Sequence, residues 1–182
     1  CDRIELGLTG AAGLVTLTGV GWGVFFSPAD WQQGESGRIM YVHVPCAWLS
    51  SSGYFALAVC SVLSLVWKHP LADLAAVEIG PVGACVTATC LATGSLWGKP
   101  MWGTWWVWDA RLTSVLVLFF LYLGHIALIH AFDDQQRGHR AAAILALAGA
   151  VDLPIIQLRV QRWTPLPPPT RITPSAAPTL SH

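Results

Sequence analysis

The stretch "LTSVLVLFFLYLGHIALIHAF", residues 112–132, contains no aspartate, glutamate, lysine or arginine. A helix rises about 1.5 Å per residue, so roughly 20 apolar residues cross a hydrocarbon layer about 30 Å thick. An uncharged stretch of this length therefore predicts a membrane-spanning helix.

Four further apolar stretches of similar length lie elsewhere in the chain. They cover residues 6–26, 41–67, 74–97 and 141–158. Spanning helices tolerate interior prolines such as Pro81 and Pro154, because neighbouring helices can satisfy the freed backbone groups. We therefore predict an all-α fold, a polytopic integral membrane helix bundle with five spanning helices and short connections.

The composition supports this fold class. Of the 182 residues, 54% are hydrophobic and 11% are charged, whereas an ordinary soluble domain carries about 25% charged residues. Ten basic and ten acidic residues give a formal net charge of zero, and the lysines and arginines are scattered. This pattern excludes nucleic-acid binding and predicts that membrane lipid surrounds the chain.

Two parts of the chain differ in character. Residues 1–158 form the predicted transmembrane domain, with a tryptophan-rich motif at 98–114, and residues 159–182 form an irregular tail rich in Pro, Ser and Thr.

Because the first residue is Cys1 and not methionine, we expect the sequence to be a piece of a longer chain. The apolar stretches hold four more cysteines without a C-x-x-C pair, which we interpret as small core residues: Cys46, Cys60, Cys85 and Cys90.

Charge bias does not fix the orientation. With a cytoplasmic N-terminus, four basic residues lie in the inner segments and six in the outer ones. The inner set is Arg3, Lys68, Arg137 and Arg140, and the outer set is Arg38, Lys99, Arg111, Arg159, Arg162 and Arg171. The positive-inside rule therefore leaves both orientations open.

The motif "GKPMWGTWWVWDARLTS", residues 98–114, places four tryptophans in seven positions. If residues 101–111 form a helix along the membrane surface, Trp102, Trp105, Trp106 and Asp109 share one face, and Trp108 points elsewhere. Such an aromatic shelf can stack on a planar apolar ligand. The indole N–H groups, Lys99 and Arg111 can then bind carboxylates at the edge of that ligand. The alternative is an amphipathic interfacial anchor.

A histidine lies close to this motif in the predicted arrangement. His43, in "YVHVP", begins the second spanning stretch, which puts it on the same side of the membrane as the tryptophans. A neutral imidazole is a suitable axial ligand for haem iron, so His43 and the shelf together predict a haem site. The alternative for a single histidine at a helix end is an ordinary polar group.

His125 and Asp152 are two of the polar side chains inside the apolar stretches. We expect His125 to form a hydrogen bond across the bundle, and Asp152 to pair with a hydroxyl or imidazole of a neighbouring helix.

The tryptophan motif, "YVHVP" and the "AFDD" at residues 131–134 together resemble the haem-handling C component of system I cytochrome c maturation. This family is called CcmC or heme exporter protein C, and it belongs to the tryptophan-rich WWD superfamily. The resemblance extends from about residue 21 to residue 163.

The resemblance implies a six-helix protein of the bacterial cytoplasmic (inner) membrane or the mitochondrial inner membrane. It implies haem b as cargo, held at the tryptophan-rich outer face and delivered to the haem chaperone, the E component, with ABC transporter components as partners. Such a protein is not an enzyme. His43 matches the first axial histidine, and the signature residues are Trp102, Trp105, Trp106, Trp108 and Asp109.

The tail departs from the family pattern. Family members carry a histidine motif after the fifth helix, where this chain has Arg162 in place of a tryptophan and Pro167 in place of the second axial histidine. We therefore expect a diverged, frameshifted or truncated tail, in which His182 is the only histidine.

Two other functions stay open from the residues. A small-molecule or proton transporter subunit needs polar groups along the bundle, and Glu78, His125 and Asp152 are the candidates. A scaffold subunit would use the tryptophans only as an interfacial anchor.

Overall fold

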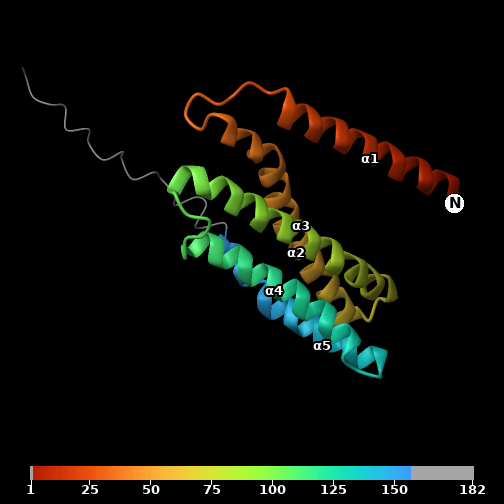
Figure 1. The fold of residues 1–182 in the computed structure, drawn as a ribbon. Helices are drawn as coiled ribbons and strands as arrows, with labels where there is room; N and C mark the ends of the chain where they lie inside the picture. The colour runs from red at the N-terminus through yellow and green to blue at the C-terminus, as the bar shows by residue number, and fades with distance from the viewer. Residues whose placement is uncertain (1, 157–182) are drawn as a thin grey trace, which may run out of the picture.

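The computed structural model describes residues 2–156 of the chain, and within this range it is helical with no strand (Figure 1). One short 3-10 helix precedes the second long helix. The elements are α1 (Asp2–Phe25), η1 (Glu35–Ile39), α2 (Met40–Trp67), α3 (Pro70–Trp102), α4 (Ala110–His130) and α5 (Gln135–Gly149).

The predicted membrane fold is confirmed for residues 2–156. Five helical segments there are long and apolar enough to cross a membrane. They are Arg3–Phe25, Glu35–Trp67, Pro70–Trp102, Ala110–His130 and Gln135–Ile156. The division of the chain at residue 158 stays a prediction, because the tail lies outside the described residues.

The third helix is longer at both ends than residues 74–97. It starts at Pro70, whose fixed φ suits the first helical position, and extended His69 precedes it. It continues to Trp102, where Gly103 adopts a left-handed conformation with φ 78°. The hydropathy pattern marks only the apolar part of this helix, because charged residues such as Asp73 and Lys99 flank that part.

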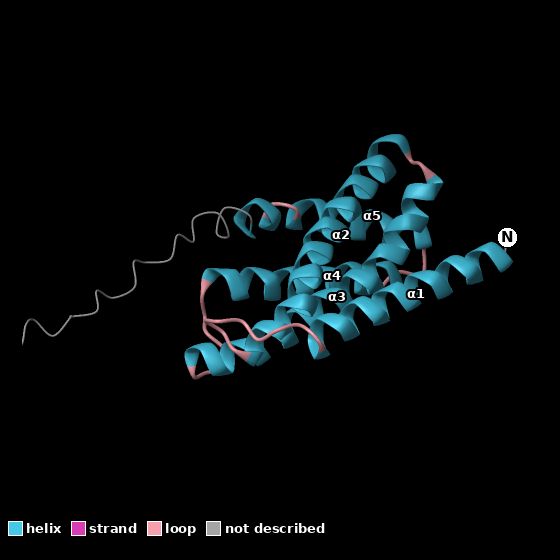
Figure 2. Ribbon diagram, turned by 90° about the horizontal axis from the view of Figure 1, so that it is seen from above, coloured by secondary structure: helices cyan, strands magenta, loops and turns pink. Residues whose placement is uncertain are grey.

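Helices α2 to α5 pack into a bundle, and α1 lies apart from it over most of its length (Figures 1 and 2). The core includes Tyr54, Leu57, Leu118 and Tyr122, each fully buried. Close helix approach needs small residues: a Cβ at Gly83 would collide with the Tyr122 ring.

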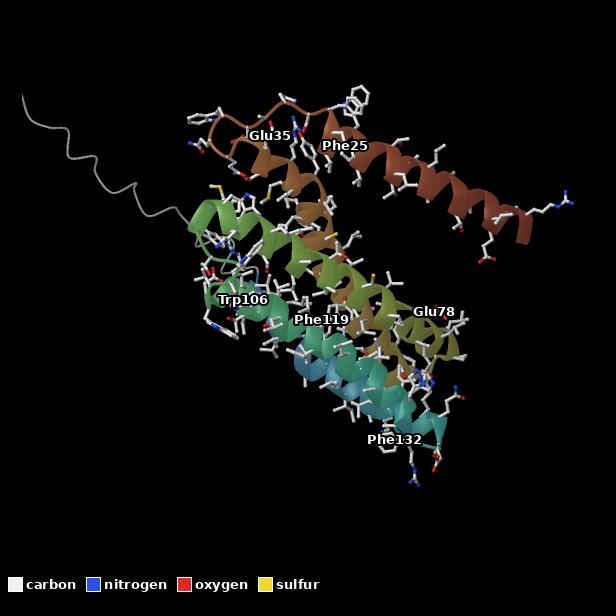
Figure 3. The ribbon with its side chains drawn as sticks, in the orientation of Figure 1. Phe25, Glu35, Glu78, Trp106, Phe119 and Phe132 are labelled. Carbon is white, nitrogen blue, oxygen red and sulfur yellow. The ribbon has the colours of Figure 1, made fainter. Side chains whose placement is uncertain are left out.

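The bundle has two different ends (Figure 1). The loop end carries residues 26–39 and 103–109, which connect α1 to α2 and α3 to α4. The turn end carries the short connections 68–69 and 131–134. Figure 3 shows Trp106 at the loop end, and Glu78 and Phe132 toward the turn end.

The predicted hydrogen bond of His125 across the bundle is confirmed. Its Nδ1 lies 3.2 Å from the Ala142 carbonyl oxygen of α5, and its Nε2 lies 3.3 Å from the Ala76 carbonyl oxygen of α3. The side chain is 2% exposed. This imidazole therefore links three helices.

The expected pairing of Asp152 is not found among the described residues. Its Oδ2 is buried without a hydrogen-bond partner there, as is the Tyr54 hydroxyl. The Tyr54 ring packs in the core, where it contacts Tyr122 edge-on with centroids 5.1 Å apart.

The cysteines were predicted to be small core residues. Cys90 is buried as predicted, whereas Cys85 is exposed at the bundle surface.

Candidate functional site

A cavity of about 410 Å³ opens at the loop end of the bundle. This volume is in the range of small-molecule and cofactor sites, which are apolar with a few polar groups. Apolar side chains of α2, α3 and α4 supply most of the wall. Its polar and aromatic lining includes Gln33, His43, Trp97, Trp102 and Arg111, and Ile156 closes one side.

His43 lies in the first turn of α2 and is half-buried against α3. Its Nδ1 lies 3.1 Å from the Cys90 carbonyl oxygen and 3.0 Å from Thr93 Oγ1. The Thr93 hydroxyl donates its own proton to the Thr89 carbonyl oxygen at 2.7 Å, so it accepts from the imidazole. Nδ1 therefore carries the proton.

The other ring nitrogen of His43 differs from Nδ1 in its surroundings. With Nδ1 protonated, the neutral imidazole keeps its lone pair on Nε2. No hydrogen bond to Nε2 is found among residues 2–156. A ligating histidine commonly donates its second N–H to a backbone carbonyl, which fixes the tautomer and the ring orientation. The Cys90 carbonyl has this arrangement relative to His43.

Close packing of the His43 ring requires a glycine on α3. A Cβ at Gly94 would lie 3.1 Å from His43 Cε1, which is tighter than ordinary van der Waals contact. Cys90, Thr93 and Gly94 follow one face of α3 at helical spacing. The sequence analysis did not connect these three residues with His43, because Cys90 and Thr93 lie 47 and 50 residues from it in the chain.

Trp102 and Arg111 meet at the edge of the cavity. The Arg111 guanidinium carbon lies 5.6 Å from the centroid of the Trp102 ring, a cation–π distance. Trp97 contacts Trp102 edge-on, with centroids 5.1 Å apart, and donates from Nε1 to Gln33 Oε1 at 3.0 Å. Trp97 lies outside the tryptophan-rich motif in the sequence, and the structure gives it a position in the cavity wall.

The predicted surface helix over residues 101–111 is wrong. Helix α3 ends at Trp102, residues 103–109 are not helical, and α4 begins at Ala110. Gly103 stops α3 in the left-handed conformation, and Asp109 caps α4 by accepting from the Leu112 amide at 2.7 Å. Trp102, Trp105, Trp106 and Asp109 therefore do not share a helical face.

The remaining tryptophans of the motif form a second group on the loop. Lys99 Nζ lies 5.7 Å from the centroid of the Trp105 ring, and Trp106 and Trp108 meet edge-on at 5.6 Å. Trp105 and Trp108 are exposed, whereas Trp106 Nε1 is buried and has no hydrogen-bond partner in the described part of the chain. None of the three lines the cavity.

The side chains of the cavity fit haem. A free imidazole nitrogen can ligate iron, apolar side chains such as Leu91, Leu112 and Val115 can contact the macrocycle, and Arg111 can pair with a propionate. Asp109 lies 3.7 Å from Arg111, so this carboxylate holds the guanidinium near the cavity. The tail positions discussed for a second ligand, Arg162, Pro167 and His182, lie outside the described residues.

Known proteins resemble this chain over most of its length. The family model "Heme exporter protein C" (CcmC) matches residues 1–182. Heme exporter protein C of Escherichia coli strain K12 is 56% identical over 156 residues, which is 85% of this chain and 64% of that protein. The corresponding Bradyrhizobium diazoefficiens protein is 51% identical over 163 residues, or 89% of this chain and 62% of that protein.

A mitochondrial relative is also similar. A ccmC-like mitochondrial protein of cytochrome c biosynthesis from Marchantia polymorpha is 45% identical over 166 residues, covering 91% of this chain and 70% of that protein. The chain thus spans a little under two thirds of the length of the two bacterial relatives.

Proposed function

The chain belongs to the heme exporter protein C family, and from this premise we propose that it binds haem b as cargo and delivers it to the haem chaperone of cytochrome c maturation. Membership in this family supports a role as a multi-pass membrane protein that handles haem in cytochrome c maturation. The family name describes transport or assembly rather than catalysis.

The observation that carries the proposal is His43 Nε2, which lies beside an apolar cavity and has no hydrogen-bond partner among residues 2–156. Its protonated Nδ1 is held by the Cys90 carbonyl and Thr93, so the ring cannot easily turn away. His43 is the axial ligand on one face of the haem. Trp102, supported by Trp97, contacts the macrocycle, and Arg111 pairs with a propionate.

The loop tryptophans take a different part in this proposal. Trp105 and Trp108 are exposed beside the cavity, so they form the surface on which the chaperone meets the haem edge. Trp106 supports Trp108 through their edge-on contact. Asp109 fixes the start of α4 and the position of Arg111, which sets the distance between the loop and the cavity.

The same family supports a proposal for the membrane and the partner proteins of this chain. We place the chain in the bacterial cytoplasmic membrane or the mitochondrial inner membrane, with the loop end on the outer face and lipid around the helices. ABC transporter components of the maturation system are the partners that act on release of the loaded chaperone.

The transporter alternative finds less support. Glu78 is exposed on α3, His125 already contacts two backbone carbonyls, and Asp152 lies toward the opposite end of the bundle from Glu78. These three side chains line no common cavity among those of the described residues. A scaffold role would leave the free His43 nitrogen and its cavity without a purpose.

The test is haem content after expression in a haem-replete host. The purified protein should show a Soret band, and His43→Ala should lose most of it. His139→Ala is the matched control, because this half-buried histidine lies at the turn end. Equal Soret absorbance per protein in all three samples would contradict the proposal, and no band in any of them would favour the scaffold.

A further inference from the structure

A second cavity, of about 1120 Å³, lies at the turn end of the bundle, far from His43. The last turn of α2, the start of α3 and the start of α5 form its walls. Its charged lining consists of Lys68, Asp73, Asp134, Arg137 and Arg140, and half-buried His139 adds an imidazole. None of these residues has a part in the haem site proposed above.

The acidic side chains of this cavity are already engaged. Asp134 accepts from the Gln136 amide at 3.0 Å and pairs with Arg137 at 3.3 Å. Asp73 accepts a hydrogen bond from the Ser64 hydroxyl. By contrast, no ion pair within residues 2–156 involves Lys68 or Arg140. The cavity therefore presents to an incoming anion two cations that have no ion-pair partner in the described part of the chain.

Polar and apolar lining residues occupy different depths. Val77 follows Asp73 by one helical turn in α3, and Ile144 follows Arg140 by one turn in α5. One turn advances about 5.4 Å along the helix, so Val77 and Ile144 lie deeper along their helices than these charged residues and form an apolar floor below a cationic rim. Candidate spans begin at Pro70 and Gln135, so this boundary lies where headgroups meet acyl chains.

We propose that the turn-end cavity is a binding site for an anionic phospholipid, with the phosphodiester between Lys68 and Arg140 and an acyl chain against Val77 and Ile144. Basic pockets between spanning helices bind acidic headgroups in this way, and each nearby basic residue adds about 1 kcal/mol. The N-terminus of α5 adds its positive dipole end to the same potential. A soluble anion would use the rim and leave the apolar floor empty.

The test measures lipid binding to the full chain in detergent by native mass spectrometry. Titration with dioleoylphosphatidylglycerol should give a saturable one-to-one adduct, and dioleoylphosphatidylcholine should bind about tenfold more weakly or worse. At about 1 kcal/mol per cation, Lys68→Gln or Arg140→Gln should weaken binding about fivefold and the double variant about thirtyfold.

Two controls separate the site from general charge attraction. Arg3→Gln removes an exposed cation at the start of α1, outside the cavity, and should leave phosphatidylglycerol binding unchanged. Ile144→Trp keeps every charge but fills the floor, and should also weaken lipid binding about fivefold or more. Haem content should not change in any of these variants.

Three results would overturn the proposal. One is a loss of phosphatidylglycerol binding in the Arg3→Gln variant that equals the loss in the Lys68→Gln or Arg140→Gln variant. Another is competition by millimolar inorganic phosphate that matches the lipid, which would make this a soluble-anion site. The third is full phosphatidylglycerol binding by the Lys68→Gln, Arg140→Gln double variant, measured on protein whose helix content by circular dichroism equals that of the parent.

Discussion

Two histidines face the interior of the bundle, and their surroundings differ. At the centre, His125 has both ring nitrogens within 3.3 Å of carbonyl oxygens and is 2% exposed. At the loop end, Nδ1 is the only ring nitrogen of His43 with a hydrogen-bond partner in the described part of the chain, and the ring borders a cavity. The comparison teaches which feature singles out His43 as a candidate ligand: a ring nitrogen beside open space that has no partner among the described residues, rather than burial alone.

The largest effect should come from removing each histidine in turn. His43→Ala should lower haem retained per folded molecule at least tenfold, because the cavity loses its only imidazole among the described residues. His125→Phe should leave that ratio within twofold but lower the free energy of unfolding by about 1–2 kcal/mol, since its contacts to α3 and α5 disappear. Soret absorbance per protein and denaturant unfolding in detergent measure the two quantities.

Loss of haem in both variants at unchanged stability would remove the distinction between the two regions. Loss of stability alone in both would make His43 a structural residue as well.

Replacing Gly94 tests the same comparison, because it displaces the His43 ring and leaves the histidine itself in place. Gly94→Leu should lower haem retention about tenfold, because a Cβ there would lie 3.1 Å from His43 Cε1 and displace the imidazole. Gly10→Leu is the control, since a Cβ at Gly10 meets nothing within 4 Å. Equal retention in the two variants would show that the ring position does not matter for binding.

The two tryptophan groups should differ as well. Trp102→Ala should lower haem retention about fivefold, because stacking and cation–π contacts at such a site contribute about 1 kcal/mol. Trp108→Ala, on the exposed loop, should change retention less than twofold but slow haem transfer to the purified chaperone. Stopped-flow absorbance during mixing with the apo-chaperone measures that transfer. The reverse pattern would put the loop, and not the cavity wall, around the haem.

The smallest effect should come from Thr93→Val. This change removes one of two acceptors of the His43 Nδ1 proton, while the Cys90 carbonyl remains. Haem retention should fall about two- to threefold, as expected when one neutral hydrogen bond contributes about 0.5 kcal/mol. Thr93→Ser, which keeps the hydroxyl, should bind as the parent does. If the valine and serine variants were equal, Thr93 would have no part in holding the tautomer.

Much of the fold is predictable because a membrane imposes length and hydropathy on each helix. The five spans follow from apolar stretches near 20 residues, and the common side of His43 and the tryptophans follows from counting crossings. Helix ends are less predictable, since α3 runs past its apolar part to Trp102 and stops at Gly103 for a conformational reason.

The site was only partly predictable from the sequence. His43, Trp102 and Arg111 were found, and the structure brings them to one cavity. The surface helix was wrong because helical periodicity was applied across Gly103 and the Asp109 cap. Thr93 lies 50 residues from His43 in the chain, and Gln33 lies 64 residues from Trp97. Contacts at such separation leave no periodic signal in a single sequence.

The most direct measurement of the central claim is rescue of His43→Ala by free imidazole. The truncated side chain leaves room for imidazole to reach the iron, so adding it should restore the Soret band and shift it toward that of the parent. The His125→Phe variant should show no response beyond that of the parent. If His43→Ala retains the parent spectrum without imidazole, or if imidazole changes it no more than it changes the parent, then His43 does not ligate the haem iron.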